Sequence, residues 1–212
     1  LQGVLGWYMV KSGLVDRPDV SQYRLAAHLV AALLIYGYLL WLFLELVSPN
    51  PDRVEVGQKH PIFRSSIVLM IFTAITISSG AFVAGLDAGL SYNTFPLMGG
   101  QLVPDGLLEL TPAYLNFFEN ITTVQFDHRV LALFVFIISI FIWIKGIQKG
   151  ISGRLAIASH LVFGSICFQV VLGVSTLLLL VPVDLAALHQ ANAFVLFGAI
   201  VWLVFETQRL NV

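Results

Sequence analysis

The sequence contains few charged residues for its length. Only 11% of its 212 residues are Asp, Glu, Lys or Arg, against about a quarter in an ordinary soluble domain. Hydrophobic residues make up 58% of the chain, which is more apolar surface than a soluble fold of this size can bury. The formal net charge of −1 does not indicate nucleic acid binding. We therefore expect a lipid bilayer as the environment of this chain.

Cysteine is equally scarce. Cys167 is the only one in the sequence, so an internal disulfide and a cysteine-based metal cluster are both excluded for these residues. The sequence starts with Leu1 rather than Met, and no signal-like segment comes before the first motif. We interpret the N-terminus as a cut end of a longer protein.

Long apolar stretches are abundant. A helix that spans a bilayer needs about 20 predominantly apolar residues. Five stretches predict such helices: 25–47, 67–86, 124–144, 155–181 and 185–204. Residues 1–10 are expected to form the last turns of a further helix. The predicted fold class is therefore all-α, a polytopic transmembrane helix bundle.

The distribution of basic residues predicts the orientation of these helices. Six lie in or beside two short connections: Arg53, Lys59, Arg64, Lys145, Lys149 and Arg154. The long loop 87–121 contains no Lys or Arg at all. By the positive-inside rule the two short connections face the cytoplasm or matrix, and the long loop faces outward.

A weak internal repeat relates the two ends of the chain. Gln, then Leu-Gly, then Leu-Ala-Ala and His occur in this order in residues 2–28 and again in residues 169–189. Repeated helix pairs are common in membrane proteins, although these residue types are abundant in any membrane helix. The order predicts that the helices of His28 and His189 correspond.

Three of the five histidines are expected at one depth. His28, His128 and His189 each follow the outer start of a predicted helix by a few residues, which places them within about 10 Å of one another along the membrane normal. His60 and His160 fall on the inner side. An ionisable residue within a span is a candidate functional residue, but an interhelical hydrogen bond is the alternative. Two imidazoles that face each other across a bundle would form a low-spin haem site.

Other residues near these histidines fit a porphyrin. Arg24 lies one turn from His28 and Arg129 follows His128, and cations near the membrane surface could bind haem propionates. Small residues recur as Gly80, Ala84 and Ala88, with Gly85 and Gly89 in a GxxxG spacing. This pattern predicts close helix packing, or a surface for a flat porphyrin. Asn120 is interpreted as a helix N-cap.

Several motifs resemble the haem A synthase family, of the type found in mitochondria and alphaproteobacteria. They are the run from Gly80 to Gly89, Tyr92-Asn93-Thr94-Phe95-Pro96, Phe118-Glu119-Asn120, Val124-Gln125-Phe126-Asp127-His128-Arg129, residues 2–14, Tyr23-Arg24-Leu25-Ala26-Ala27-His28, and His189-Gln190. The resemblance extends over essentially the whole chain.

The resemblance implies eight helices in two similar four-helix halves, with this chain beginning late in the third helix. It implies that His128 and His189 are the axial ligands of a haem b iron in the C-terminal half, where Arg129 is the candidate propionate partner. It assigns His28, with Arg24 beside it, to the substrate haem in the N-terminal half. The catalytic residues are unknown and are expected upstream of Leu1, together with the other substrate-side histidine.

The corresponding domain assignment has four parts. Residues 1–50 are part of a pseudo-symmetric N-terminal, substrate haem half, and residues 51–64 are a cytoplasmic linker. Residues 65–206 are a complete C-terminal four-helix haem b half, and residues 207–212 are a cytoplasmic tail.

The implied function is that of an oxidoreductase. The reaction is oxidation of the C8 methyl group of haem O to the formyl group of haem A, for cytochrome oxidase assembly. The alternatives are a membrane b-type cytochrome that only transfers electrons, and a transporter or assembly subunit with structural histidines.

The implied partners are haem O, an electron acceptor and the bilayer. Haem O synthase and a second copy of the chain are further candidate partners, and nucleic acid is not expected. The implied location is the bacterial or mitochondrial inner membrane, and the fragment alone is expected to be inactive.

Overall fold

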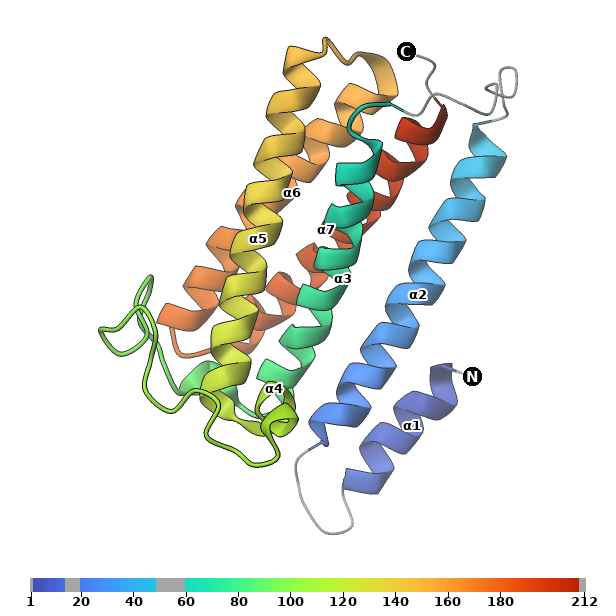
Figure 1. Cartoon of the computed structure of the whole chain (residues 1–212). Helices are drawn as coiled ribbons and strands as arrows, with labels where there is room; N and C mark the ends of the chain where they lie inside the picture. Colours follow the sequence, from blue (N-terminus) through green and yellow to red (C-terminus); the bar gives the residue numbers. More distant parts are fainter. Residues whose placement is uncertain (1, 14–19, 49–59, 210–212) are drawn as a thin grey trace.

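The computed structural model describes residues 2–13, 20–48 and 60–209, and long helices dominate these ranges (Figure 1). In chain order the elements are α1 (Gln2–Gly13), α2 (Gln22–Val47), α3 (Phe63–Gly85), η1 (Ala88–Leu90), η2 (Ala113–Leu115), α4 (Asn116–Glu119), α5 (Ile121–Gln148), α6 (Gly153–Leu178) and α7 (Val183–Arg209). Five of them, α2, α3, α5, α6 and α7, are long and apolar enough to cross a membrane. The five predicted spans are therefore confirmed, and residues 2–10 are helical as expected.

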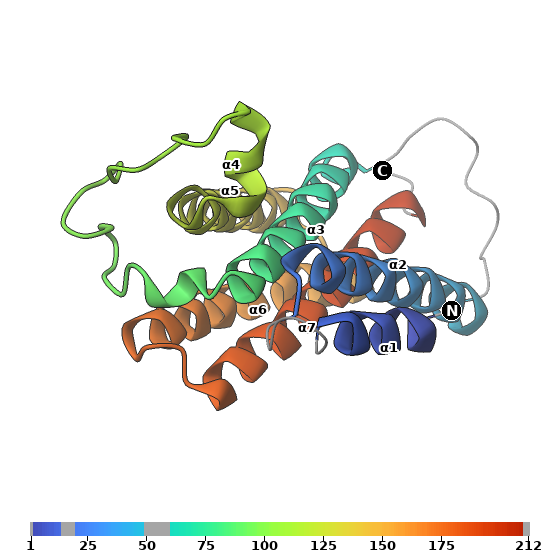
Figure 2. The ribbon, with the colours of Figure 1, turned by 90° about the horizontal axis from the view of Figure 1, so that it is seen from below.

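Four of the long helices form a bundle. Helix α3 packs on α5 and on α7, and α6 packs on the same two helices. Helices α5 and α7 therefore occupy opposite corners of the bundle (Figure 2). Helix α2 packs outside the bundle, against α3 and α7, and α1 packs on α2. Large apolar side chains on the outer helix faces, such as Leu34, Leu46 and Leu133, are exposed, as contact with lipid requires.

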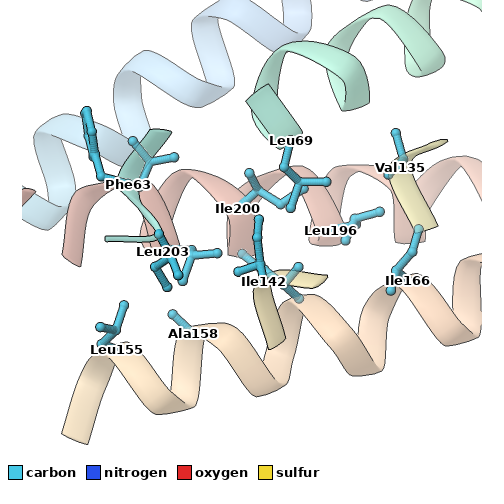
Figure 3. Packing of buried hydrophobic residues seen from close by; sticks show 14 residues of the cluster. Phe63, Leu69, Val135, Ile142, Leu155, Ala158, Ile166, Leu196, Ile200 and Leu203 are labelled. Carbon is cyan, nitrogen blue, oxygen red and sulfur yellow. The ribbon is translucent and has the colours of Figure 1, made fainter. Parts of the chain in front are cut away.

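The bundle has a side-chain core at the end remote from the long loop. Leu69, Leu155, Ile200 and Leu203 are completely or almost completely buried there, and they come from α3, α6 and α7 (Figure 3). At the same end Glu206 accepts hydrogen bonds from Arg154 Nε at 2.7 Å and from Trp202 Nε1 at 2.8 Å. We call this end, where Arg154 lies, the basic end, and packed side chains fill it.

Helices α2 and α7 contact each other through a reciprocal pair of aromatic and glycine residues. The hydroxyl of Tyr36 lies where a Cβ on Gly198 would be, and a Cβ on Gly37 would lie 3.2 Å from Phe197 Cε1. Tyr36 and Phe197 are separated in sequence by the same interval as His28 and His189. Each of the two helices therefore places an aromatic ring on a glycine of the other, which is how surfaces related by a two-fold axis contact each other.

The long loop is folded against the opposite end, which we call the loop end. Asn120 Oδ1 accepts a hydrogen bond from Thr123 N at 2.9 Å, so the predicted N-cap of α5 is confirmed. Its amide nitrogen donates to Gly106 O at 2.9 Å. Asn116 is fully buried and bonds both the N–H and the carbonyl of Leu110. Side chains of α4 and α5 therefore hold the loop in place.

Helices α3 and α7 end at different positions from those expected. Helix α3 ends at Gly85, and Gly89 lies beyond it in η1, so the two glycines do not share a helix and do not form a GxxxG helix surface. Gly85 still marks close packing, since a Cβ there would lie 2.6 Å from the Cα of Gln22. Helix α7 continues to Arg209, into the segment expected as a tail. Most of the expected linker, residues 51–59, lies outside the described residues.

Candidate functional site

Three histidines lie at the loop end of the helices. His28 is in the second turn of α2, His128 in the second turn of α5 and His189 in the second turn of α7. All three of these helices begin at the loop end (Figure 1). The three side chains are half-buried. All three histidines therefore lie near the starts of their helices, at the loop end, as predicted.

The other two histidines lie toward the basic end. His160, in the second turn of α6, accepts a hydrogen bond from Trp143 Nε1 at 2.9 Å. The backbone N–H of His60 donates to Thr207 O at 3.3 Å. Burial, and then the positive charge of Lys149, hold the pKa of the His60 imidazole below its usual range. Both residues belong to the packing at this end, away from the other three.

His128 is held against α3 in a defined tautomer. Its Nδ1 lies 2.8 Å from Ser79 Oγ, and the Ser79 hydroxyl donates its proton to Thr76 O at 2.8 Å. With its proton on Thr76 O, Ser79 Oγ can accept from Nδ1–H of His128 in the tautomer that keeps Nε2 unprotonated. This leaves the Nε2 lone pair of His128 free to bind a metal, the usual role of a histidine oriented in this way. A Cβ on Gly80 would lie 3.2 Å from His128 Cε1, so the ring packs on bare backbone.

His189 packs against α6, where an amide donor rather than a hydroxyl lies beside its ring. Gln169 Nε2 donates to His189 O at 3.0 Å and lies 3.2 Å from His189 Nδ1. A Cβ on Gly173 would lie 2.9 Å from His189 Cε1. Gln169 and Gly173 are one turn apart on α6, so one helix face provides both the hydrogen bond and the flat surface for the ring.

His28 makes the same set of contacts with α1. Gln2 Nε2 donates to His28 O at 2.9 Å and lies 3.2 Å from His28 Nδ1. A Cβ on Gly6 would lie 3.1 Å from His28 Cε1. The matching atoms and distances show that Gln2, Gly6 and His28 correspond to Gln169, Gly173 and His189. The predicted correspondence between the two helix pairs is confirmed at the level of contacts.

The C-terminal bundle carries two histidines, His128 and His189, at its loop end. They come from helices α5 and α7, which occupy opposite corners of the bundle. Among the described residues there is no group of three or more His, Cys, Asp or Glu that could hold a metal ion. A porphyrin brings its own four nitrogen ligands and needs only one or two axial side chains from the protein.

Arg129 holds the motif Tyr92 to Pro96 over this site. Its two terminal nitrogens donate to Tyr92 O at 2.7 Å and to Thr94 O at 2.9 Å, and its Nε is buried without a partner among the described residues. Asn93 fixes the motif to α6, since its amide donates to Leu177 O at 2.9 Å. The loop therefore bridges α5 and α6 above the histidines, and the unpaired Nε is a donor available to an anionic ligand.

Arg24 lies against α1. Its guanidinium carbon is 4.9 Å from the ring centroid of Tyr8, which is a cation–π distance. The neighbouring Tyr23 donates to Glu119 Oε1 at 2.7 Å and thus connects α2 to the long loop. The structure therefore places Arg24 one turn from His28, as expected.

Several residues of the site were not predicted from the sequence. Ser79, Gln2, Gln169 and Asn192 are polar residues in apolar helices. The repeat contained both glutamines and both glycines, but it did not indicate that each Gln-Gly pair faces a histidine. The available signal was the four-residue spacing from Gln to Gly, which puts both on one helix face.

Comparison with known proteins identifies related sequences. The family model of COX15-CtaA, a cytochrome oxidase assembly protein, matches residues 1–201. A heme A synthase of Nitrosospira multiformis is 47% identical over 209 residues, which are 99% of this chain and 59% of the relative. One from Parvibaculum lavamentivorans is 45% identical over 99% of this chain and 58% of the relative. Heme A synthase COX15 of Bos taurus is 43% identical over 99% of this chain and 52% of the relative.

The chain thus spans between half and three fifths of the length of these relatives. Within that span the match runs through both histidine-bearing helices of the bundle and through α1 and α2. The membrane helices, the histidines at the loop end and the extent of the match lead to one conclusion: the chain belongs to the COX15-CtaA family of cytochrome oxidase assembly proteins.

Proposed function

We propose that the protein to which this chain belongs is a haem A synthase, an oxidoreductase that converts the C8 methyl group of haem O into the formyl group of haem A. The proposal rests on the family match and on the names of the relatives. The product would serve cytochrome oxidase assembly. The reaction also requires an electron acceptor of unknown identity.

What supports the proposal is that His128 and His189 both lie at the loop end, on helices α5 and α7. These helices occupy opposite corners of the bundle, and each ring packs on a glycine. We assign them as the axial ligands of a haem b, with Nε2 of His128 free for the iron because Ser79 binds Nδ1. The unpaired Nε of Arg129 is the donor that we assign to a propionate. A haem held here would supply electron transfer.

The N-terminal part of the chain would handle the substrate. His28, held by Gln2 and Gly6 in the same way as His189, is the proposed ligand to the substrate haem, with Arg24 beside it. The second substrate-side ligand and the catalytic residues would come from parts of the relatives' length that this chain does not match. The four-part domain assignment remains part of this proposal.

The surroundings follow from the same proposal. Five apolar helices make this a multi-pass membrane protein, and we place it in the bacterial or mitochondrial inner membrane. Haem O synthase would be a partner that delivers the substrate. A second copy of the chain is a further partner, which a molecular mass measurement in detergent would test.

The test uses the full-length protein with single substitutions. His128→Ala and His189→Ala should each abolish the reduced-minus-oxidised haem b spectrum, whereas His60→Ala and His160→Ala should keep it. Haem A formation from haem O then separates the enzyme from a cytochrome that only transfers electrons. A wild-type protein with a haem b spectrum and no haem A product would favour the cytochrome. A haem b spectrum that survives His189→Ala would refute the ligand assignment.

A further inference from the structure

The basic end carries exposed cations from two neighbouring helices. Arg64 lies in the first turn of α3, and Lys145 and Lys149 lie at the end of α5. All three side chains are exposed. None of them has an acidic partner among the described residues, whereas Arg154 at the same end is paired with Glu206. Helix α3 packs on α5, and these two helix ends lie together (Figure 1), so unbalanced positive charge collects there.

His60 adds a further donor to this group. It lies one turn before Arg64, and its carbonyl accepts a hydrogen bond from Phe63 N at 2.8 Å. Burial and the nearby positive charge of Lys149 lower the pKa of its imidazole. Ile62 N donates to its Nδ1 at 3.4 Å, and in the neutral tautomer that accepts this bond the proton is on Nε2. An N–H donor therefore lies beside the charge of Lys149.

The surface that continues from these cations along the helices is apolar. On α3, Val68 and Ile71 are 43% and 50% exposed, and they lie four and seven residues after Arg64, on the same helix face. On α5, Phe134 is also exposed, and its ring centroid lies 6.3 Å from that of Phe72 on α3. An apolar face therefore runs from the cations along two helices that are long enough to cross a membrane.

Lys145 connects the charged end to this apolar face. Its Nζ lies 5.8 Å from the ring centroid of Phe141, one turn earlier on α5. The apolar stem of the lysine therefore lies over the exposed ring while its ammonium group stays at the helix end, as lysines do at a membrane interface. This position places the charge at the level of the lipid headgroups.

Cations at the end of an apolar membrane face match the chemistry of a phospholipid. Like charges repel one another, and an anion that binds between them removes this cost. Juxtamembrane Lys and Arg residues attract anionic lipids by about 1 kcal/mol each. A free phosphate ion would make the same polar contacts but would bury no apolar surface. The continuous apolar face therefore favours a lipid over a free anion.

We propose that the basic end binds one anionic phospholipid. His60, Arg64 and Lys149 hold its phosphodiester group, and its acyl chains lie along the apolar face of α3 and α5. These two helices also bring Ser79 to His128 at their other ends, so a lipid that bridges them helps to keep the pair together. The inference does not depend on the proposed haem chemistry, because its polar residues lie at the end remote from the three histidines.

Native mass spectrometry of the delipidated full-length protein in detergent tests the proposal. The probes are phosphatidylglycerol and phosphatidylcholine with identical acyl chains. One phosphatidylglycerol should bind saturably, with roughly tenfold higher affinity than phosphatidylcholine, because only the former has a net charge. Arg64→Gln and Lys149→Gln should each weaken its binding about fivefold, which corresponds to about 1 kcal/mol for each basic residue.

Three variants serve as controls. Lys11→Gln removes the same charge from α1, near the loop end, and should leave phosphatidylglycerol binding unchanged. Arg64→Lys and Lys149→Arg keep the charge and should keep most of the affinity. A lipid that binds these two variants but not the glutamine variants is recognised by charge at these positions.

Three results would overturn the proposal. The first is equal binding of the two lipids to the wild type, which remains decisive if a glutamine variant does not fold. The second is wild-type phosphatidylglycerol binding by the double variant Arg64→Gln, Lys149→Gln. The third is displacement of phosphatidylglycerol by inorganic phosphate, because the site would then recognise the phosphate group without the lipid.

Discussion

Each of the three histidines at the loop end packs its ring on a glycine of a neighbouring helix. Gly6 faces His28, Gly80 faces His128 and Gly173 faces His189, and a Cβ on any of them would lie 3.2 Å or less from the ring. A glycine inside a helix costs about 0.5–1 kcal/mol relative to alanine. Three such positions opposite three histidines indicate that the lack of a side chain is required for the orientation of the rings.

Replacement of Gly173 tests this requirement. Gly173→Ala should displace His189, because the new Cβ would lie 2.9 Å from Cε1. Overpacking of this kind costs about 1–3 kcal/mol, so haem b affinity should fall roughly tenfold to a hundredfold. The measurement is the amount of haem b per protein and its rate of loss in the purified full-length variant.

Gly164 provides the control on the same helix. A Cβ on Gly164 would meet no atom within 4 Å, so Gly164→Ala gains helix propensity without touching a histidine. It should keep the haem content and leave thermal stability unchanged or slightly higher. Equal haem content in the two variants would show that His189 tolerates a side chain at position 173.

At the scale of whole elements, the long loop is held by two helices. Arg129 and Gln125 of α5 donate to the carbonyls of Tyr92 and Thr94, and Asn93 donates to Leu177 O of α6. Hydrogen bonds from a charged donor each contribute about 1.5–3 kcal/mol. The order of the loop therefore depends largely on a side chain adjacent to His128.

Arg129→Ala should loosen the loop. We expect amide hydrogen exchange in residues 92–101 to become at least tenfold faster, because two of the hydrogen bonds to its carbonyls are lost. Exchange measured by mass spectrometry on the full-length protein would show this. Arg64→Ala, an exposed site near the basic end, is the control and should leave these peptides unchanged. Unchanged exchange combined with loss of haem b would assign Arg129 to the propionate alone.

The sequence predicted the helices far better than their mutual contacts. Apolar length alone located five spans, and distance from the helix start placed His28, His128 and His189 at one depth. Hydropathy carries no information on which residue of a neighbouring helix a side chain meets. Ser79 and Asn192 are therefore recognised only from the packed structure, where hydrogen bonds connect residues far apart in the chain.

The fold of the long loop was also beyond prediction. It has no periodic pattern, and its order comes from buried amides such as Asn116 and from the positive backbone φ angles of Asp87 and Leu108. The GxxxG spacing did not correspond to one helix surface for a related reason. Spacing alone cannot show where a helix ends, and α3 ends at Gly85.

At the scale of the whole molecule, the chain covers only part of its relatives. It contains the bundle of α3, α5, α6 and α7 with His128 and His189, and it spans between half and three fifths of the relatives' length. Residues 1–212, expressed alone and inserted in a membrane, should bind haem b and form no haem A. The reason is that a substrate held by one ligand is poorly positioned, and a misplacement of about 1 Å can cost a hundredfold in rate.

Spectroscopy and product analysis of the same membranes would check both statements, with the full-length protein as the positive control. Haem A made by residues 1–212 alone would place the active centre within the bundle of α3, α5, α6 and α7. It would contradict the proposal that the substrate haem is bound and oxidised outside this bundle.

The reciprocal contact between α2 and α7 has a consequence for how the two halves can move. Tyr36 occupies the space above Gly198 while Phe197 occupies the space above Gly37, so a slide of either helix by one residue would drive both rings into side chains. These two contacts therefore prevent α2 and α7 from sliding along each other. Because each ring packs on a glycine, backbone atoms set the distance between the two helices. If His28 and His189 hold haems as proposed, the distance between the two irons would therefore be set by this helix contact and would stay constant during turnover.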